Sequence, residues 1–189
     1  MTRGEALKIV DELVTSKNIR SHCLAAEAAM IGLYEYFEKK GKIGTGTAED
    51  WGIVGLLHDA DYEVTNKSLE LHTEETTKKL KEAGAPKEII DAVRCHADKE
   101  PRNTMMAKAI YAADELTGLI VAAALVRPDK KLEGLTTESV LKRFKEPAFA
   151  AGANRDQIKT CESELDVNLK VFTETILNSM KKISKDLGL

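Results

Sequence analysis

The chain of 189 residues is poor in aromatic side chains, and neither charge sign dominates it. Phe, Trp and Tyr make up only 5% of the residues, which leaves few rings on which single-stranded bases could stack. The 31 acidic residues outnumber the 28 Lys and Arg residues, so a broad electrostatic grip on nucleic acid is not expected. Both features argue against a general nucleic-acid-binding protein.

The chain also has few cysteines and no long apolar run. The number of cysteines is odd, since the chain has only Cys23, Cys95 and Cys161. A chain of this size also does not need a disulfide framework. The most apolar stretch, residues 107–126, contains charged residues, and its unbroken part is far shorter than the ~18 residues of a membrane helix. The first 14 residues alternate charged and apolar side chains, unlike a signal peptide. We therefore expect a cytoplasmic protein with no membrane partner.

Apolar residues recur at steps of three and four in most segments, which is the spacing of one face of an α-helix. The clearest stripe consists of Ile19, Cys23, Ala26, Met30, Leu33 and Phe37. No segment shows convincing strand-like alternation, and no internal repeat is present. The sequence therefore predicts an all-α fold in one domain, with residues 127–189 as a helical extension packed on a core of about residues 19–126.

Capping and helix-breaking residues indicate where the helices begin and end. Thr47 followed by Asp50 is typical of a capping arrangement. Pro86 suits the first turn of a helix, because its missing N–H would have had no partner there. The expected helices are a first through Ala6 to Leu13, a second capped by Asn18, a third after Thr47, a fourth over 69–82, a fifth from Pro86 to His96, a sixth over 104–126, short helices on either side of 146–154, and a last over 161–185.

Ligand-type side chains fall on helix faces that are expected to meet in the core. His22 lies beside the stripe of the second helix, and His96 continues the apolar face of the fifth. His58 and Asp59 end an apolar run, where a desolvated carboxylate is costly unless it is paired. Asp114 lies on an apolar face of the sixth helix, where its carboxylate would also need a partner. Imidazole and carboxylate groups repeated across four helices suit a divalent transition metal with mixed N and O ligands.

Each of these residues also has a purely structural interpretation. A single histidine on an apolar face is more often a hydrogen-bonded core residue than a ligand. A single buried aspartate is more often part of an ion pair. Only the combination of several such residues favours a metal site.

The ordered set of His22, His58-Asp59 and Asp114 resembles the H…HD…D signature of the HD-domain superfamily of metal-dependent phosphohydrolases. The contexts Arg-Ser-His, Leu-Leu-His-Asp and Tyr-Ala-Ala-Asp around these residues are similar to the family's first, second and last motifs. The resemblance covers residues 19–117, roughly half of the chain. It implies an all-α, HD-domain-like helical bundle with the site in its core, and most often hydrolysis of phosphate esters.

Two further histidines extend this resemblance to the binuclear members of the superfamily, which place two histidines between HD and the final Asp. The implied metal ligands are His22, His58, Asp59, His72, His96 and Asp114. Asp59 would bridge one or two divalent ions (Mn, Fe, Co, Ni, Mg or Zn), which would activate water and stabilise phosphoryl charge. Residues 73–75 and Glu115 are candidates to support these ligands, and solvated helix faces are the alternative for them. The implied substrate is a phosphomonoester or phosphodiester of a small, nucleotide-like molecule.

The chain departs from some members of the family that it resembles at the position of the proton-transfer group. Some nucleotidase members carry a Glu four residues after the motif histidine, where this chain has Tyr62, and others carry a Lys close to HD that is missing here. Asp61 is the nearest candidate acid, which would act as a catalytic residue together with Asp59. Arg20 and Lys108 are candidates for binding the substrate phosphate, Arg20 through its planar guanidinium fork. A surface ion pair is the alternative role for Arg20.

Two other functions remain open at this point. A few relatives with a two-iron site activate dioxygen instead of hydrolysing esters. A regulatory HD module would bind metal or nucleotide without turnover. The intact ligand set argues against the regulatory module, and the missing acid favours it.

Overall fold

The computed structural model describes residues 1–189 and contains helices but no strands, which confirms the predicted all-α fold. No helix is long and apolar enough to cross a membrane. The helices are α1 (Arg3–Leu13), α2 (Lys17–Glu38), α3 (Ala48–Leu57), α4 (Glu74–Glu82), α5 (Lys87–His96), α6 (Met105–Leu125), α7 (Thr137–Phe144), α8 (Arg155–Ser163), α9 (Leu169–Lys182) and α10 (Ser184–Leu187).

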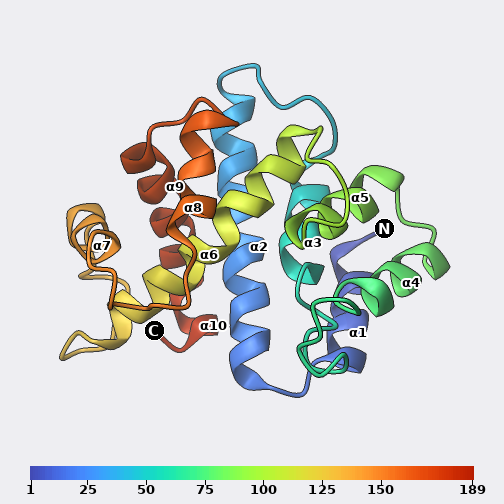
Figure 1. The fold of residues 1–189 in the computed structure, drawn as a ribbon, viewed down its shortest axis with the longest axis horizontal. Helices are drawn as coiled ribbons and strands as arrows, with labels where there is room; N and C mark the ends of the chain where they lie inside the picture. The colour runs from blue at the N-terminus through green and yellow to red at the C-terminus, as the bar shows by residue number, and fades with distance from the viewer.

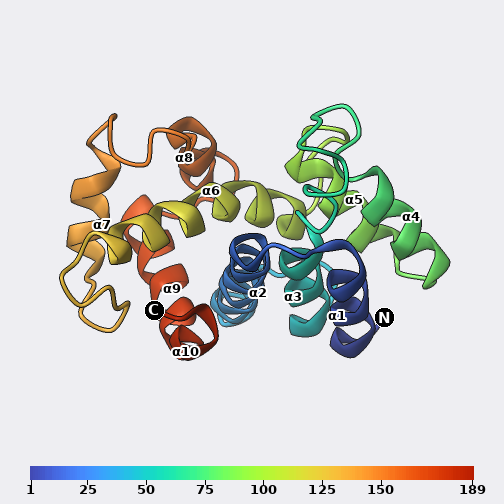
Figure 2. The ribbon, with the colours of Figure 1, turned by 90° about the horizontal axis from the view of Figure 1, so that it is seen from below.

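Helices α2 and α6 lie at the centre of the fold (Figure 1). Helix α2 packs against α3 on one side and against α9 on the other. Figure 2 shows that α1, α3, α4 and α5 lie on one side of α2, and that α7 to α10 lie on the other. Helix α6 crosses both groups and contacts α2, α5 and α8. Residues from both groups of helices can therefore meet at one place along α6.

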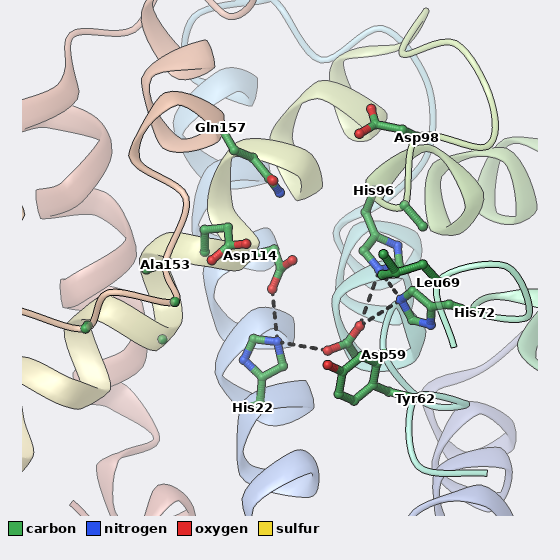
Figure 3. Close-up of a pocket in the computed structure, with 15 residues that line it drawn as sticks. His22, Asp59, Tyr62, Leu69, His72, His96, Asp98, Asp114, Ala153 and Gln157 are labelled. Atoms are coloured by element: carbon green, nitrogen blue, oxygen red, sulfur yellow. Dashed lines mark hydrogen bonds and ion pairs between the residues drawn. The ribbon is translucent and has the colours of Figure 1, made fainter. Parts of the chain in front are cut away.

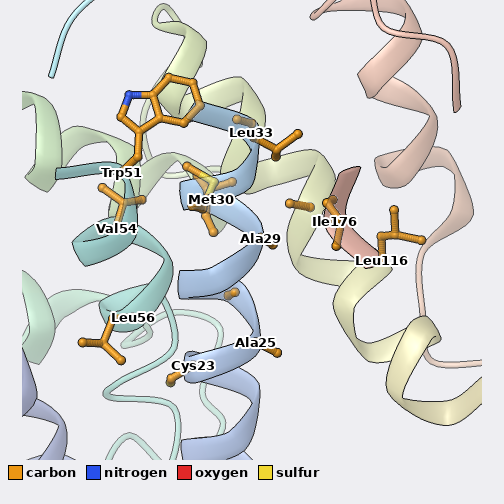
Figure 4. Close-up of a cluster of buried hydrophobic side chains, with 14 of the residues drawn as sticks. Cys23, Ala25, Ala29, Met30, Leu33, Trp51, Val54, Leu56, Leu116 and Ile176 are labelled. Atoms are coloured by element: carbon orange, nitrogen blue, oxygen red, sulfur yellow. The ribbon is translucent and has the colours of Figure 1, made fainter. Parts of the chain in front are cut away.

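A close contact between α2 and α3 positions the residues that follow α3. The side chains of Met30 and Trp51 are completely buried between these helices and their neighbours (Figure 4). Lower in the same interface, a Cβ atom on Gly55 would lie only 2.4 Å from the carbonyl oxygen of Ala26. Only glycine allows the two backbones to approach this closely. The approach brings the end of α3 against the segment of α2 that carries His22.

Local capping signals located several helix ends well. Thr47 and Asp50 form a complete capping box at the start of α3, and Thr104 caps α6 through the N–H of Ala107. Pro86 directly precedes α5. The predicted start of α2 was wrong by two residues: the cap is Ser16, whose hydroxyl accepts from the N–H of Ile19. Such shifts are small for sequence-based helix limits.

Two predicted helix starts were wrong by several residues. Helix α4 begins at Glu74 instead of residue 69, because its first turn is capped by a distant side chain described below. Residues 146–154 form turns between the short helices α7 and α8, as predicted, and the Arg155 guanidinium satisfies carbonyl groups of this segment. The last long helix begins at Leu169, because residues 161–163 complete α8.

Candidate metal centre

Six ligand-type side chains from separate parts of the chain surround one cavity of about 730 Å³ (Figure 3). Five of them line it, and His58 lies completely buried behind them. Helices α2, α5 and α6, the turn after α3 and the segment before α4 supply them. The structure thus brings together His22, His58, Asp59, His72, His96 and Asp114, as the sequence pattern predicted them to be grouped.

The first group of ligand atoms surrounds Nε2 of His22. This atom lies 3.0 Å from Oδ1 of Asp114 and 3.0 Å from Nε2 of His58. Oδ2 of Asp59 lies 3.4 Å from the same Nε2. Nitrogen and oxygen atoms from three elements therefore converge on a common point.

The second group shares Asp59 with the first. Oδ1 of Asp59 lies 3.1 Å from Nε2 of His72 and 3.3 Å from Nε2 of His96, and these two nitrogens are 2.9 Å apart. Its other oxygen, Oδ2, faces His22. One carboxylate thus presents one oxygen to each group, which is the arrangement of a bridging ligand.

The ring hydrogens of three histidines are fixed by their neighbours. Nδ1–H of His58 donates to the carbonyl oxygen of Gly55 at 2.8 Å, and that of His96 donates to the carbonyl of Val93. Nδ1–H of His72 donates to a carboxylate oxygen of Asp61 at 2.9 Å. In the neutral rings each Nε2 then carries a lone pair, and lone pairs that face each other repel unless a proton or a metal cation lies between them. The donor set therefore fits divalent metal ions.

The carboxylates determine the charge of this cluster. Burial disfavours the charged form of His22, but the hydrogen bonds and charges of Asp114 and Asp59 outweigh it and raise the pKa to about 10. The same balance, with Asp59 and Asp61 as partners, raises the pKa of His72 to about 9. Burial also opposes ionisation of Asp59 and Asp114, yet the surrounding histidines hold both pKa values below the usual range. Without an ion, protons on the histidines balance these carboxylates.

Asp61 supports a histidine and does not reach the cavity, which corrects the prediction that it is the catalytic acid. Its side chain is completely buried. Besides His72, it accepts from the N–H groups of Thr73 and Thr76, at 2.9 and 3.1 Å. Burial would raise its pKa, but these hydrogen bonds lower it below the usual value. Asp61 is therefore an anionic cap of α4 that does not line the cavity.

The residue that Asp61 caps has an unusual backbone conformation. Thr73 has a φ of 71°, in the left-handed region that a β-branched residue rarely adopts. Its own side chain makes no capping hydrogen bond. Because Asp61 satisfies the amide instead, the strained turn is held in place, and the orientation of the neighbouring His72 is fixed with it.

The structure also corrects the phosphate-binding roles predicted for Arg20 and Lys108. Nη1 of Arg20 pairs with Oδ1 of Asp11 at 2.6 Å, beside a groove between α1 and α2. Lys108 precedes Asp114 by six residues on α6, a rotation of about 600° that turns it to another face of the helix. Neither side chain lines the cavity.

Several other residues that line the cavity do not belong to the sequence motifs. Tyr62 and Leu69 cover the side next to His72, where the Tyr62 ring meets the imidazole edge-on with centroids 5.5 Å apart. Glu115 and Gln157 line the opposite wall. Glu115 stood out beside Asp114, but nothing in the local sequence marked Gln157, because only tertiary packing of α8 brings it here.

Comparison with known families identifies an HD domain over residues 20–119. No curated protein matches the chain, and no solved structure matches it. The matched segment is more than half of the chain and includes every residue of the two ligand groups. The chain therefore belongs to the HD-domain family, in the superfamily of metal-dependent phosphohydrolases.

Proposed function

We propose that this protein hydrolyses a phosphomonoester or phosphodiester of a small, nucleotide-like molecule with metal-activated water. The observation that carries the proposal is the placement of Asp59, whose two carboxylate oxygens face separate histidine groups. A carboxylate that joins two sets of imidazole nitrogens is suited to a pair of neighbouring divalent ions.

The residues divide into two ligand sets. His22, His58, Asp59 and Asp114 would hold one ion, and Asp59, His72 and His96 a second. When bound, such ions supply a Lewis acid and lower the pKa of water toward neutrality. No Lys or Arg lines the cavity, so the charge of the ions would attract the anionic substrate.

The chain's own contribution is to fix these ligands before substrate arrives. Gly55, Val93 and Asp61 hold the Nδ1 atoms of three histidines. For His22, the Thr117 hydroxyl lies 3.4 Å from Nδ1 and donates its own hydrogen to the carbonyl of Asp114. All four Nε2 atoms are therefore directed at the cluster, which lowers the reorganisation needed on binding.

A metal and substrate panel tests this function. Metal-free protein is reconstituted separately with Mn, Fe, Co, Ni, Mg and Zn, and phosphate or p-nitrophenol release is followed from p-nitrophenyl phosphate and bis-p-nitrophenyl phosphate. We expect one to two ions per chain and metal-dependent release. Oxygen uptake by the iron-loaded protein without ester cleavage would instead favour the di-iron oxygenase. Metal uptake without either reaction would favour the regulatory module.

A pair of variants makes the panel specific. Asp59→Asn should lose activity and metal binding together. Asp166→Asn is the matched control, because Asp166 is 90% exposed and has a φ of 56°, a conformation that Asn tolerates. Equal losses in both variants would contradict the assignment of Asp59.

A further inference from the structure

One wall of the cavity, formed by α6, α8 and the turn before α8, differs chemically from the ligand cluster (Figure 3). Two polar side chains, Glu115 and Gln157, line this wall. The rest of it consists of small residues, including Gly118 and Gly152, where an added Cβ would meet no atom within 4 Å. The wall therefore leaves space for an organic group beside the ligand cluster, with two side chains available to contact it.

The orientation of the Gln157 amide is fixed by the main chain. Its Nε2 donates to the carbonyl oxygen of Tyr111 at 2.9 Å. The flipped amide would place Oε1 against that carbonyl oxygen, where two acceptors repel. Oε1 consequently remains without a protein partner on a residue that lines the cavity.

Glu115 repeats this arrangement with a carboxylate. Its Oε2 accepts from the N–H of Asn154 at 3.1 Å, which ties the side chain to the turn before α8. Its Oε1 has no protein partner. Each of the two residues is thus held by one polar atom and retains an acceptor oxygen for a ligand.

The arginine side chains near this wall are already paired with other groups of the protein. Arg155 donates to main-chain carbonyl groups of residues 146–153. Arg102 pairs with Glu164 and Asp98, at 3.1 and 2.6 Å. This wall therefore offers hydrogen-bond acceptors instead of positive charge, and it matches an organic group that carries hydrogen-bond donors.

We propose that the substrate of this site carries a polyhydroxylated group, a sugar or polyol, whose hydroxyls donate to Gln157 Oε1 and Glu115 Oε1. The proposal rests on the proposed function, because the phosphoryl group is taken to lie at the ligand cluster. A free sugar phosphate and the ribose of a nucleotide share this chemistry. The two acceptors act as specificity-determining groups, since a substrate without hydroxyls leaves them desolvated and unpaired.

Calorimetric binding to the metal-loaded protein tests this directly. The probes are D-ribose 5-phosphate and cyclopentylmethyl phosphate, which has a ring of similar size without hydroxyls. We expect the sugar phosphate to bind at least about tenfold more tightly, as one or two hydrogen bonds to such acceptors would give. Equal affinity for the two probes would overturn the proposal.

Two substitutions test whether Glu115 and Gln157 cause the tighter binding of the sugar phosphate. In Glu115→Gln the amide oxygen must accept from Asn154, which turns the NH₂ group toward the cavity. Gln157→Leu removes the other acceptor at similar size. Each should lower the tenfold preference several-fold, whereas Glu133→Gln, at an exposed position, should leave it intact. A preference that survives both wall substitutions would also overturn the proposal.

Further outcomes distinguish the recognition of hydroxyls from the proposed hydrolysis of phosphate esters. They also distinguish a nucleotide ribose from a free sugar phosphate. If p-nitrophenyl phosphate is hydrolysed but neither ring probe binds, only the hydroxyl recognition is overturned. If no phosphate ester is bound or hydrolysed, the proposed function is overturned with it. Uridine 5′-monophosphate binding more tightly than ribose 5-phosphate would support recognition of a nucleotide ribose, and weaker binding would support a free sugar phosphate.

Discussion

Oδ1 of Asp61 accepts a hydrogen bond from Nδ1 of His72 at 2.9 Å, and both side chains are buried. The same carboxylate caps α4 through Thr73 and Thr76. One side chain therefore couples a helix start to a ligand of the second group. Carboxylate partners of this kind set the tautomer and orientation of a metal-bound imidazole.

Asp61→Asn should weaken one of the two ions selectively. Asparagine has a single acceptor oxygen for three N–H groups, so the Nδ1–H of His72 or an amide of α4 loses its partner. We expect the affinity for the second ion to fall about 10- to 100-fold while the first ion stays bound. Calorimetric metal titration with elemental analysis measures this, and thermal melting monitors folding. Equal weakening of both ions, with folding intact, would contradict the separate role of His72.

Most of the ligand residues could be predicted from their spacing in the sequence. The residues that hold these ligands in place could not. Histidines and aspartates on apolar helix faces stood out because burial of such groups needs a partner. Asp61 was misassigned because it was chosen for its closeness to the His58-Asp59 pair in sequence, whereas its partners lie 11 to 15 residues further along the chain. Arg20 was likewise judged by its closeness to His22 in sequence, although its guanidinium turns toward Asp11.

The fold shows the same division between local and tertiary causes. The capping box at Thr47 depends on two residues three positions apart, and it was predicted correctly. Short helices were predicted on either side of residues 146–154, and α7 and α8 lie there. The carbonyl groups of the segment between them are satisfied by Arg155, which no local pattern indicates. Gln157 reaches the cavity only because α8 packs on α6.

A comparison of Asp59→Ala with Cys23→Ala separates ligand loss from general damage. Asp59→Ala should abolish metal binding and activity, because it removes the only carboxylate shared by both groups. Cys23 is completely buried, and burial raises the pKa of its thiol, so it is inert. Cys23→Ala should retain the metal and most of the activity, at a stability cost of about 1 kcal/mol. Similar metal loss in both variants would contradict the ligand assignment.

Metal affinity should rise steeply with pH. In the ion-free protein the raised pKa values of His22 and His72, about 10 and 9, keep both rings protonated at pH 7. A metal must displace these protons, so binding at pH 7 should release about two protons and become tighter as the pH increases toward 9. Calorimetry in buffers with different ionisation enthalpies gives the proton count. Binding without proton release would show that the histidines are not the ligands.

Two helical glycines provide the last prediction, because they differ in what surrounds them. A Cβ on Gly55 would meet the carbonyl oxygen of Ala26 at 2.4 Å, whereas a Cβ on Gly118 would meet no atom within 4 Å. Gly55→Ala should lower the free energy of unfolding by about 1–3 kcal/mol, since α2 and α3 must separate. It should also weaken metal binding, because the same approach sets His22 against His58, whose Nδ1–H donates to the Gly55 carbonyl.

Gly118→Ala is the matched control, because Gly118 also lies within a helix. It should raise the free energy of unfolding by about 0.5–1 kcal/mol, because alanine loses less conformational entropy than glycine on entering a helix. Metal affinity should stay unchanged, since the added methyl group points into open cavity space. Urea unfolding and metal titration of both variants provide the two measurements. If Gly55→Ala keeps full stability and metal affinity, the close approach of α2 and α3 does not build the first ligand group.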